Sequence, residues 1–373
     1  MHARSLKVTV FLFACLLLCS CTVGRFVIYN FAGTNDWRKF PSRPLPASPE
    51  PYRYAVAETE KLPHGITYEG KDQTFDEFIE ERETVAFLVI QRDTIVYERY
   101  YKGYDEAHLH ASFSMAKSLL SMLIGCAIAD GYITGVDQPV TDFIPELRKN
   151  GFDKVTVENL LQMTSGLDFN ESYKSPFGDA ATFYYGRRLY RGMAKMKLGH
   201  PPGEHFEYQS GSSQLLGWIL ERALRKGGDM RTITAYTNDK IWAPLGMVHP
   251  ASWSIDRKKG GIEKTFCCLN APARDFAMLG SLYLHKGNWR GKQLVPKEWV
   301  EQSTRLDTAN GSAPFYQYQW WLPSAEGDFE AKGYLGQFIY VDPARELVMV
   351  RLGTNYGKMD WTLVMRDQAK GYQ

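Results

Sequence analysis

The alternation of hydrophobic and polar positions predicts a β-hairpin near each end of the chain. Residues 84–90 (TVAFLVI) and 94–101 (TIVYERYY) are rich in β-branched and aromatic residues, and a short polar stretch separates them. Two later runs, 337–341 and 346–352, flank the turn-forming sequence Asp-Pro-Ala-Arg in the same way. The chain is therefore expected to contain strands on both sides of a long central region.

The central region follows a helical pattern. A helix is expected from about residue 113 to residue 130, followed by Gly131 as its C-terminal cap. Its inward face is expected to carry Leu119, Leu120, Met122, Leu123, Cys126 and Ala127. Residues 136–250 show further helical segments that glycine and proline interrupt. This order predicts an α+β fold: an antiparallel sheet flanked by helices and built from both termini, with an inserted, mainly helical domain.

The same patterns give the expected domain boundaries. We expect the sheet domain to comprise residues 56–135 and 251–373, with the helical domain at 136–250. Residues 22–55 are expected to form an extended tether, because closely spaced prolines disfavour a helix there. These prolines are Pro41, Pro44, Pro46, Pro49 and Pro51.

Residues 1–21 are typical of a secretory signal. Basic residues precede an apolar run at 8–18 that is too short to span a membrane comfortably. The sequence Leu-Cys-Ser-Cys at 18–21 resembles the bacterial lipobox, which implies lipidation of Cys21. We therefore expect an exported lipoprotein, tethered to a membrane in the bacterial cell envelope or periplasm. An uncleaved anchor, helped by the apolar residues 26–29, and simple secretion are the alternatives.

Composition excludes several classes of protein. The 373 residues include 44 Lys and Arg and 42 Asp and Glu, so a net charge of +2 leaves no basic surplus for a nucleic-acid partner. Hydrophobic residues (44%) and charged residues (23%) occur at ordinary globular frequencies. No glycine-rich phosphate loop is present, so nucleotide binding has no support. Of the 6 cysteines, the adjacent Cys267 and Cys268 are expected to serve only in packing.

The stretch Ser114-Met115-Ala116-Lys117 is the first to suggest catalytic chemistry. Positions i and i+3 share a face of a helix, so the lysine amine can reach the serine hydroxyl. A free serine is a poor nucleophile that needs a base, and a buried lysine with a lowered pKa can serve as one. The alternative is a surface serine beside a solvated lysine, because so short a motif also arises by chance.

Two later stretches supply further candidate groups. Tyr208 can move a proton beside a lysine, and Ser210, two positions on, can bind the substrate or the lysine. Gly333 and Tyr334 enter the last hairpin, where a glycine lets a substrate approach the backbone closely. The amide of Tyr334 can then join that of Ser114 as an oxyanion hole.

Taken together and in this order, the three stretches resemble the serine β-lactamase and penicillin-binding-protein superfamily. They are most similar to its class C β-lactamase branch, which includes esterases and the 6-aminohexanoate-dimer hydrolases. That family carries Ser-x-x-Lys, then Tyr-x-Asn or Tyr-x-Ser, then Lys-Thr-Gly or His-x-Gly. The resemblance covers roughly residues 80 to 365, and further stretches like those of the family lie at 160–167, 202–203, 214–217, 273–275 and 318–321.

The resemblance implies a role for each candidate residue. Ser114 matches the acylated nucleophile, Lys117 its proton-accepting partner, and Tyr208 the general base or acid. Ser210 replaces the family asparagine with a shorter polar arm. Gly333 and Tyr334 match the strand that lines the site.

One departure from the family lies on this strand. Where β-lactamases have a lysine, this chain has Ala331, and Lys332 is displaced by one position. Neighbouring residues of a strand face opposite sides, so Lys332 is expected to point away from the site. We therefore expect poor activity on β-lactams, which carry a carboxylate near the scissile bond.

The resemblance implies a serine hydrolase that cleaves a small amide or ester substrate through an acyl-enzyme. The alternatives are a D-peptidase or weak β-lactamase of the cell envelope, or a non-catalytic binding protein on the same fold. No cofactor and no metal are expected. His108 and His110 lack an evident third ligand, and His200 and His205 are assigned to the surface or to packing.

Overall fold

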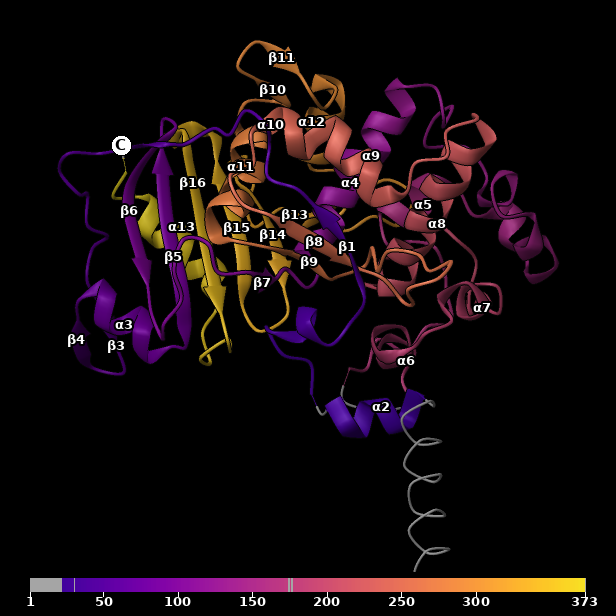
Figure 1. The fold of residues 1–373 in the computed structure, drawn as a ribbon, viewed down its shortest axis with the longest axis horizontal. Helices are drawn as coiled ribbons and strands as arrows, with labels where there is room; N and C mark the ends of the chain where they lie inside the picture. The colour runs from indigo at the N-terminus through magenta and orange to yellow at the C-terminus, as the bar shows by residue number, and fades with distance from the viewer. Residues whose placement is uncertain (1–21, 30, 174, 176, 373) are drawn as a thin grey trace, which may run out of the picture.

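An eight-stranded sheet, built by both ends of the chain, forms one half of the molecule (Figure 1). The computed structural model describes residues 22–29, 31–173, 175 and 177–372. In spatial order, the strands are β12 (Tyr316–Gln317), β13 (Trp320–Trp321), β14 (Phe329–Gly333), β15 (Gln337–Asp342), β16 (Leu347–Gly353), β5 (Thr84–Gln91), β6 (Thr94–Tyr100) and β2 (Ala55–Val56). Neighbouring strands are antiparallel except β2, which runs parallel to β6 at the edge.

The two predicted hairpins occupy the centre of this sheet. β5 pairs with β6, β15 pairs with β16, and β16 pairs with β5, so strands from opposite ends of the sequence lie side by side. The turn between β5 and β6 is tight, because Arg92 and Asp93 adopt φ values of 50° and 57°. The predicted α+β fold, with an antiparallel sheet built from both termini, is confirmed.

Helices cover both faces of the sheet. Leu88 and Val350 face the larger hydrophobic core, whereas Phe87 and Met349 face a second core on the opposite side. This division follows from the two-residue period of a strand. The helices over the first core are α4 (Met115–Ala129) and α11 (Ala273–Leu284), and those over the second are α3 (Phe75–Glu81) and α13 (Trp361–Ala369).

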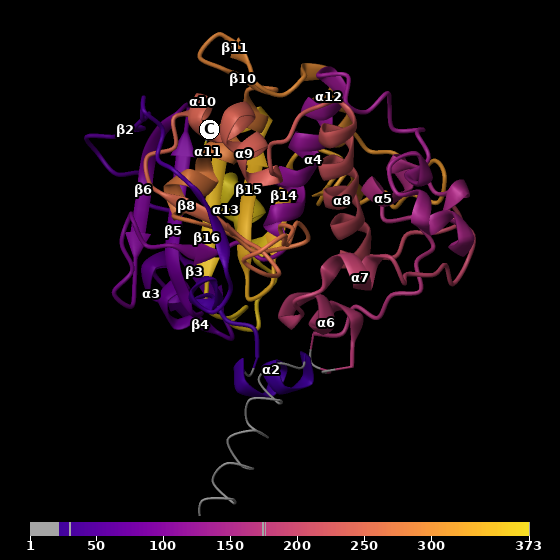
Figure 2. The same ribbon diagram turned by 45° about the vertical axis from the view of Figure 1, so that its right-hand side comes forward.

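The segment between the two sheet-forming ends folds into helices beside the sheet (Figure 2). They are α5 (Val157–Leu161), α6 (Asp179–Tyr185), α7 (Leu189–Met193), α8 (Ser210–Lys226), α9 (Ile233–Thr237) and α10 (Ala243–Leu245). The same segment has 3₁₀ helices at Val140–Asp142, Pro145–Asn150 and Phe152–Lys154 and a π-helix at Asn238–Trp242. α8 packs against α4, which therefore lies between the sheet and the helical part. The six apolar residues expected on the inward face of α4 are all buried.

Smaller elements complete the fold. A four-stranded sheet has the order β1 (Ser42–Leu45), β8 (Ala251–Ser254), β9 (Leu269–Ala271) and β7 (His110–Ala111). Two short hairpins are β3 (Ile66–Tyr68) with β4 (Lys71–Gln73), and β10 (Asn288–Trp289) with β11 (Lys292–Gln293); α12 (Lys297–Ser303) follows the second. β7 matters most for function, because it leads directly into α4.

The prediction of a free tether at residues 22–55 is wrong for the part that the structure describes. The segment begins with a helix, α2 (Thr22–Tyr29), and its strand β1 pairs along its whole length with β8. Further on, the amide of Tyr52 donates to the carbonyl of Gly246 at 2.8 Å. Each proline removes only its own amide donor, and an edge strand tolerates that loss. The remaining amides are enough to hold the segment against the body.

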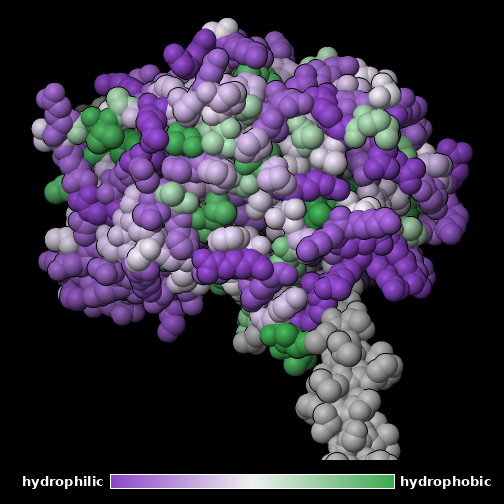
Figure 3. Space-filling model, viewed as in Figure 1, coloured by the Kyte–Doolittle hydropathy of each residue, from purple (hydrophilic) through white to green (hydrophobic). Residues whose placement is uncertain are grey.

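α2 lies at the outer surface of the helical part. Its Phe26 packs on Tyr185 of α6, with ring centroids 5.2 Å apart. The face seen in Figure 3 is largely hydrophilic, and a hydrophobic group stands out below the body, where α2 lies. Val27 and Ile28 of α2, and Phe31 just after it, are exposed. Among the residues described, no helix is both long and apolar enough to cross a bilayer. Cys21 and the predicted signal lie outside the described residues.

Candidate active site

Ser114 immediately precedes the first residue of α4, at the end of a strained turn. Phe113 has a φ of 46°, which is rare for a bulky residue and turns the chain from β7 into the helix. Lys117, one helical turn later, places its Nζ 2.9 Å from the Ser114 Oγ. The side chain of Ser114 makes no capping bond to the helix, so its hydroxyl is not engaged there.

Lys117 is buried and uses three hydrogen bonds. Besides Ser114, its Nζ donates to Ser210 Oγ at 3.1 Å and to the carbonyl oxygen of Phe266 at 2.8 Å. Burial disfavours the charged amine and lowers the pKa of Lys117 to about 8, although the carboxylate of Glu171 acts in the opposite direction. A substantial fraction of the amine is therefore neutral close to physiological pH.

Tyr208 lies beside both residues. Its ring centroid is 5.0 Å from Lys117 Nζ, and its ring stacks on Trp321 at 5.5 Å and meets Tyr316 edge-on at 6.0 Å. Burial raises the pKa of Tyr208 above its ordinary value, while a hydrogen bond with Ser114 acts in the opposite direction. The phenol thus stays protonated at neutral pH, which suits a proton donor better than a base.

Ser210 is fully buried and belongs to a polar network that the sequence did not reveal. Its Oγ donates to Glu171 Oε1 at 2.6 Å, and its amide donates to Glu171 Oε2 at 2.7 Å. The Tyr173 hydroxyl donates to Glu171 at 2.5 Å and lies 2.8 Å from Ser210 Oγ. Of the two partners considered for Ser210, the lysine or the substrate, the structure provides the lysine. Glu171 and Tyr173 come from an irregular loop with no motif to mark them.

Gly333 and Tyr334 lie where β14 passes the start of α4. A Cβ on Gly333 would come 2.3 Å from the carbonyl oxygen of Ser112, so only glycine fits this approach. The Tyr334 ring stacks on Tyr173 at 5.9 Å and meets Phe113 edge-on at 5.6 Å. Within the described part of the chain, neither the amide of Ser114 nor that of Tyr334 donates a hydrogen bond.

The face of β14 that packs on the larger core carries Phe329 and Ala331 and therefore no cation. Ala331 is buried in that core, opposite Ile339. Lys332 lies on the other face of β14, where its Nζ forms an ion pair with the buried Glu330 at 2.8 Å. Trp320 is fully buried, whereas Trp321 stacks on Tyr208, and its ring centroid lies 4.9 Å from the Nζ of Lys332.

Cys267 and Cys268 form a disulfide between adjacent residues, where only packing was expected. They directly follow Phe266, whose carbonyl accepts the hydrogen bond from Lys117. Cysteine number and spacing gave no signal for this bond, since an odd count outside the signal argued against pairing. The disulfide therefore lies next to a residue that holds the lysine in place.

The histidines expected to lack a metal role fall into two groups. His110 is buried, which lowers its pKa to about 3, and His108 stacks on Tyr104 at 3.9 Å. His200 and His205 instead come together with Glu207, their potential ligand atoms all within 4.8 Å of one another. This cluster lies near the surface and is separate from the Ser114–Lys117 pair.

Comparisons with known proteins agree with the fold and identify the family. The model of the Beta-lactamase family matches residues 72–363. A 6-aminohexanoate-dimer hydrolase from Paenarthrobacter ureafaciens is 29% identical over 303 residues, which cover 74% of each protein. A putative 6-aminohexanoate-dimer hydrolase from Bacillus anthracis has a structure that matches with a TM-score of 0.79 at 25% identity, covering 90% of this chain and 91% of that one.

A putative β-lactamase from Bacteroides dorei DSM 17855 shares the fold at 18% identity, with a TM-score of 0.65 over 79% of this chain and 96% of its own. The family match spans most of the chain, and it confirms the resemblance drawn from the three motifs. The chain belongs to the β-lactamase family and is a serine hydrolase.

Proposed function

We propose that this protein hydrolyses a small amide or ester by forming an acyl-enzyme on Ser114, as a relative of the 6-aminohexanoate-dimer hydrolases. The observation that carries this proposal is the 2.9 Å contact between Ser114 Oγ and the Nζ of buried Lys117. With its pKa lowered to about 8, the lysine can take the hydroxyl proton when its amine is neutral.

In the first half of the reaction, Ser114 Oγ bonds to the substrate carbonyl carbon as its proton passes to Lys117. The negative oxygen of the tetrahedral intermediate needs hydrogen-bond donors, and the unpaired amides of Ser114 and Tyr334 are the candidates. Collapse of the intermediate breaks the bond to the leaving nitrogen or oxygen. Tyr208, whose phenol is protonated at neutral pH, gives its proton to the leaving group, and the Lys117 ammonium then reprotonates the resulting phenolate, which leaves the lysine neutral.

In the second half, water takes the place of the leaving group. It attacks the acyl carbonyl and gives one proton to the neutral Lys117. Collapse of the second tetrahedral intermediate breaks the bond to Ser114 Oγ, which takes that proton back from the Lys117 ammonium as the carboxylic acid is released. Ser210 and Glu171 act as positioning residues, because they hold the lysine through the 3.1 Å contact to Ser210 Oγ and the 2.6 Å contact behind it.

The surroundings of the site favour an uncharged acyl group. Aromatic rings of Trp321, Tyr173 and Tyr334 lie around the serine and lysine. Ala331 provides no cation, and the Nζ of Lys332, which lies 4.9 Å from the Trp321 ring, is already paired with the buried Glu330. This arrangement supports a linear amide or ester over a carboxylate-bearing β-lactam or D-peptide.

Labelling with a fluorophosphonate probe tests the proposed nucleophile. The wild-type protein should take up one probe molecule, located on Ser114 by peptide mass spectrometry. The Ser114→Ala variant should take up none, whereas Ser118→Ala, which changes a buried serine on the same helix, should still be labelled. Labelling of the Ser114→Ala variant contradicts the proposal, because another residue is then the nucleophile. Failure to label the wild type also contradicts it and favours a non-catalytic binding protein.

We also propose that the protein is exported and tethered to a membrane through a lipid on Cys21. The support is the sequence at 18–21 together with the exposed Val27, Ile28 and Phe31 on the segment that follows. Fractionation of cells that express the Cys21→Ser variant checks this. Release from the membrane fraction supports lipidation, and retention with an uncleaved N-terminus supports the anchor alternative.

A further inference from the structure

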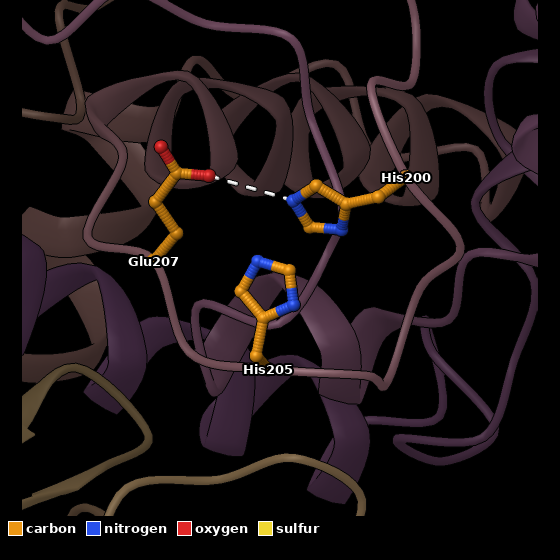
Figure 4. A group of neighbouring side chains, drawn as sticks. All are labelled: His200, His205 and Glu207. Carbon is orange, nitrogen blue, oxygen red and sulfur yellow. Dashed lines mark hydrogen bonds and ion pairs between the residues drawn. The ribbon is translucent and has the colours of Figure 1, made fainter.

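His200, His205 and Glu207 form a compact cluster on the loop that leads into α8 (Figure 4). The two imidazole rings lie 4.0 Å apart between centroids, at an angle of 30°. His200 Nε2 is 3.5 Å from Glu207 Oε2, and the His205 ring lies below the gap between these two side chains. Among the residues described, the His205 ring has no hydrogen-bond or ion-pair partner.

The orientation of His200 directs a ligand atom into the cluster. Its Nδ1 lies 3.4 Å from the carbonyl oxygen of Pro201, the side from which a ring N–H would donate. With the proton on Nδ1, Nε2 is free to act as a ligand atom 3.5 Å from Glu207 Oε2; with the proton on Nε2, the same contact is a hydrogen bond to the carboxylate. A metal ion bound between Nε2 and the carboxylate oxygen would take the place of the proton that these two atoms otherwise share. A backbone carbonyl on the second ring nitrogen is also the arrangement that orients metal-bound histidines.

We propose that His200, His205 and Glu207 bind a divalent transition metal of the Zn²⁺ class. Two imidazole nitrogens and one carboxylate oxygen within 4.8 Å of one another can converge on one ion, with water as the fourth ligand of a tetrahedron. Imidazole ligands favour Zn²⁺, Cu²⁺ or Ni²⁺ over Ca²⁺ and Mg²⁺, which prefer sites made of oxygen atoms. This departs from the expectation that these histidines serve only the surface or packing.

The metal would join the two ends of the loop at 200–207. One end is held where the amide of His200 donates to the carbonyl of Gly166, and the other where the amide of Glu207 donates to the carbonyl of Met163. Tyr208 follows directly, so the ion would stiffen the backbone that delivers this residue to the site. The site is therefore structural, and its proposal does not depend on the hydrolytic reaction.

The proposal is tested by calorimetric titration with Zn²⁺. The protein is full-length and tag-free, is first treated with a chelator to remove bound metal, and is kept in detergent. We expect one ion per chain, with tetrahedral absorption bands when Co²⁺ is used as a spectroscopic probe. His205→Ala and Glu207→Gln should each weaken binding at least about tenfold, the loss seen when groups that support a metal site are removed. His64→Ala is the matched control, because His64 pairs with Asp367 elsewhere on the surface, and it should bind Zn²⁺ like the wild type.

Thermal unfolding gives a second readout that needs no enzyme activity. Zn²⁺ should raise the unfolding temperature of the wild type and of Ser114→Ala equally, and raise that of His205→Ala much less. Equal Zn²⁺ affinity in wild type, His205→Ala and Glu207→Gln overturns the proposal, since the binding is then adventitious. The absence of binding to the wild type also overturns it, and leaves a shared proton between His200 and Glu207.

Discussion

Lys117 and Glu171 are linked through a single hydroxyl group, that of Ser210. Lys117 Nζ donates to Ser210 Oγ at 3.1 Å, and the same oxygen donates onward to Glu171 Oε1 at 2.6 Å. The lysine thus experiences two opposing influences: burial lowers its pKa, and the nearby carboxylate raises it. The balance between them sets the pH range in which the proposed base is neutral.

The first prediction concerns the pH dependence of the wild type. Lys117 must be neutral to accept a proton, so kcat/KM should rise with pH and level off above the lysine pKa of about 8. Below that value, activity should fall about tenfold per pH unit. The measurement is the rate of p-nitrophenyl ester hydrolysis from pH 5.5 to 10, corrected for the uncatalysed reaction. A flat profile through this range would show that Lys117 does not act as the base.

The second prediction concerns Glu171→Gln. Removing the carboxylate charge removes the influence that raises the pKa of Lys117, so the rising limb should move to lower pH. The glutamine can still accept a hydrogen bond from Ser210, which limits structural change. Glu301→Gln, an exposed carboxyl that pairs with Lys286, serves as the control and should leave the limb in place. A shift of the Glu171→Gln limb to higher pH contradicts the proposed electrostatics.

The third prediction concerns the contact between β14 and the start of α4. Gly333→Ala should lower activity strongly and stability by about 1–3 kcal/mol, because the new Cβ would meet the Ser112 carbonyl oxygen 2.3 Å away and force the backbones apart. Gly135→Ala is the matched control, since no atom lies within 4 Å of its added Cβ. Urea unfolding and ester hydrolysis of both variants provide the comparison. Wild-type activity in Gly333→Ala would show that this close approach does not shape the site.

The fourth prediction is that the protein is a poor β-lactamase. The core-facing position of β14 holds Ala331, and the Nζ of Lys332, beside Trp321, is already paired with Glu330. Loss of a charge-assisted contact to the substrate carboxylate costs roughly 1.5–3 kcal/mol, or about one to two orders of magnitude in catalytic efficiency. Nitrocefin and a p-nitrophenyl ester, tested on one preparation with a class C β-lactamase as positive control, measure the difference. Nitrocefin turnover as efficient as that of the control enzyme contradicts the prediction.

Much of the fold could be predicted from local pattern, and the reasons are visible in particular residues. The runs at 84–101 and 337–352 have the composition and turns of hairpins, and they form the centre of the sheet. The prolines at 41–51 were misleading, because proline content alone does not show whether the intervening amides find partners. Here they do, along β8 and near Gly246.

The candidate site was predictable only where its residues are close in sequence. Ser114 and Lys117 meet because a helix brings positions i and i+3 together, and the structure places them 2.9 Å apart. Glu171 and Tyr173 reach the lysine from an irregular loop through tertiary packing, which no local pattern specifies. The proximity of His200, His205 and Glu207 was missed for a related reason, since the turn that brings these side chains together has no periodic signal.

The most direct test of the central claim is to trap the covalent intermediate. The protein is mixed with excess p-nitrophenyl ester, quenched in acid within the first turnovers, and analysed by intact and peptide mass spectrometry. We predict one acyl group per chain, located on Ser114, and a matching burst of p-nitrophenol. Ser114→Ala should show neither, although it should fold normally, since the Ser114 side chain does not cap α4. An acyl group on another residue, or undiminished hydrolysis by Ser114→Ala, would contradict the proposed mechanism.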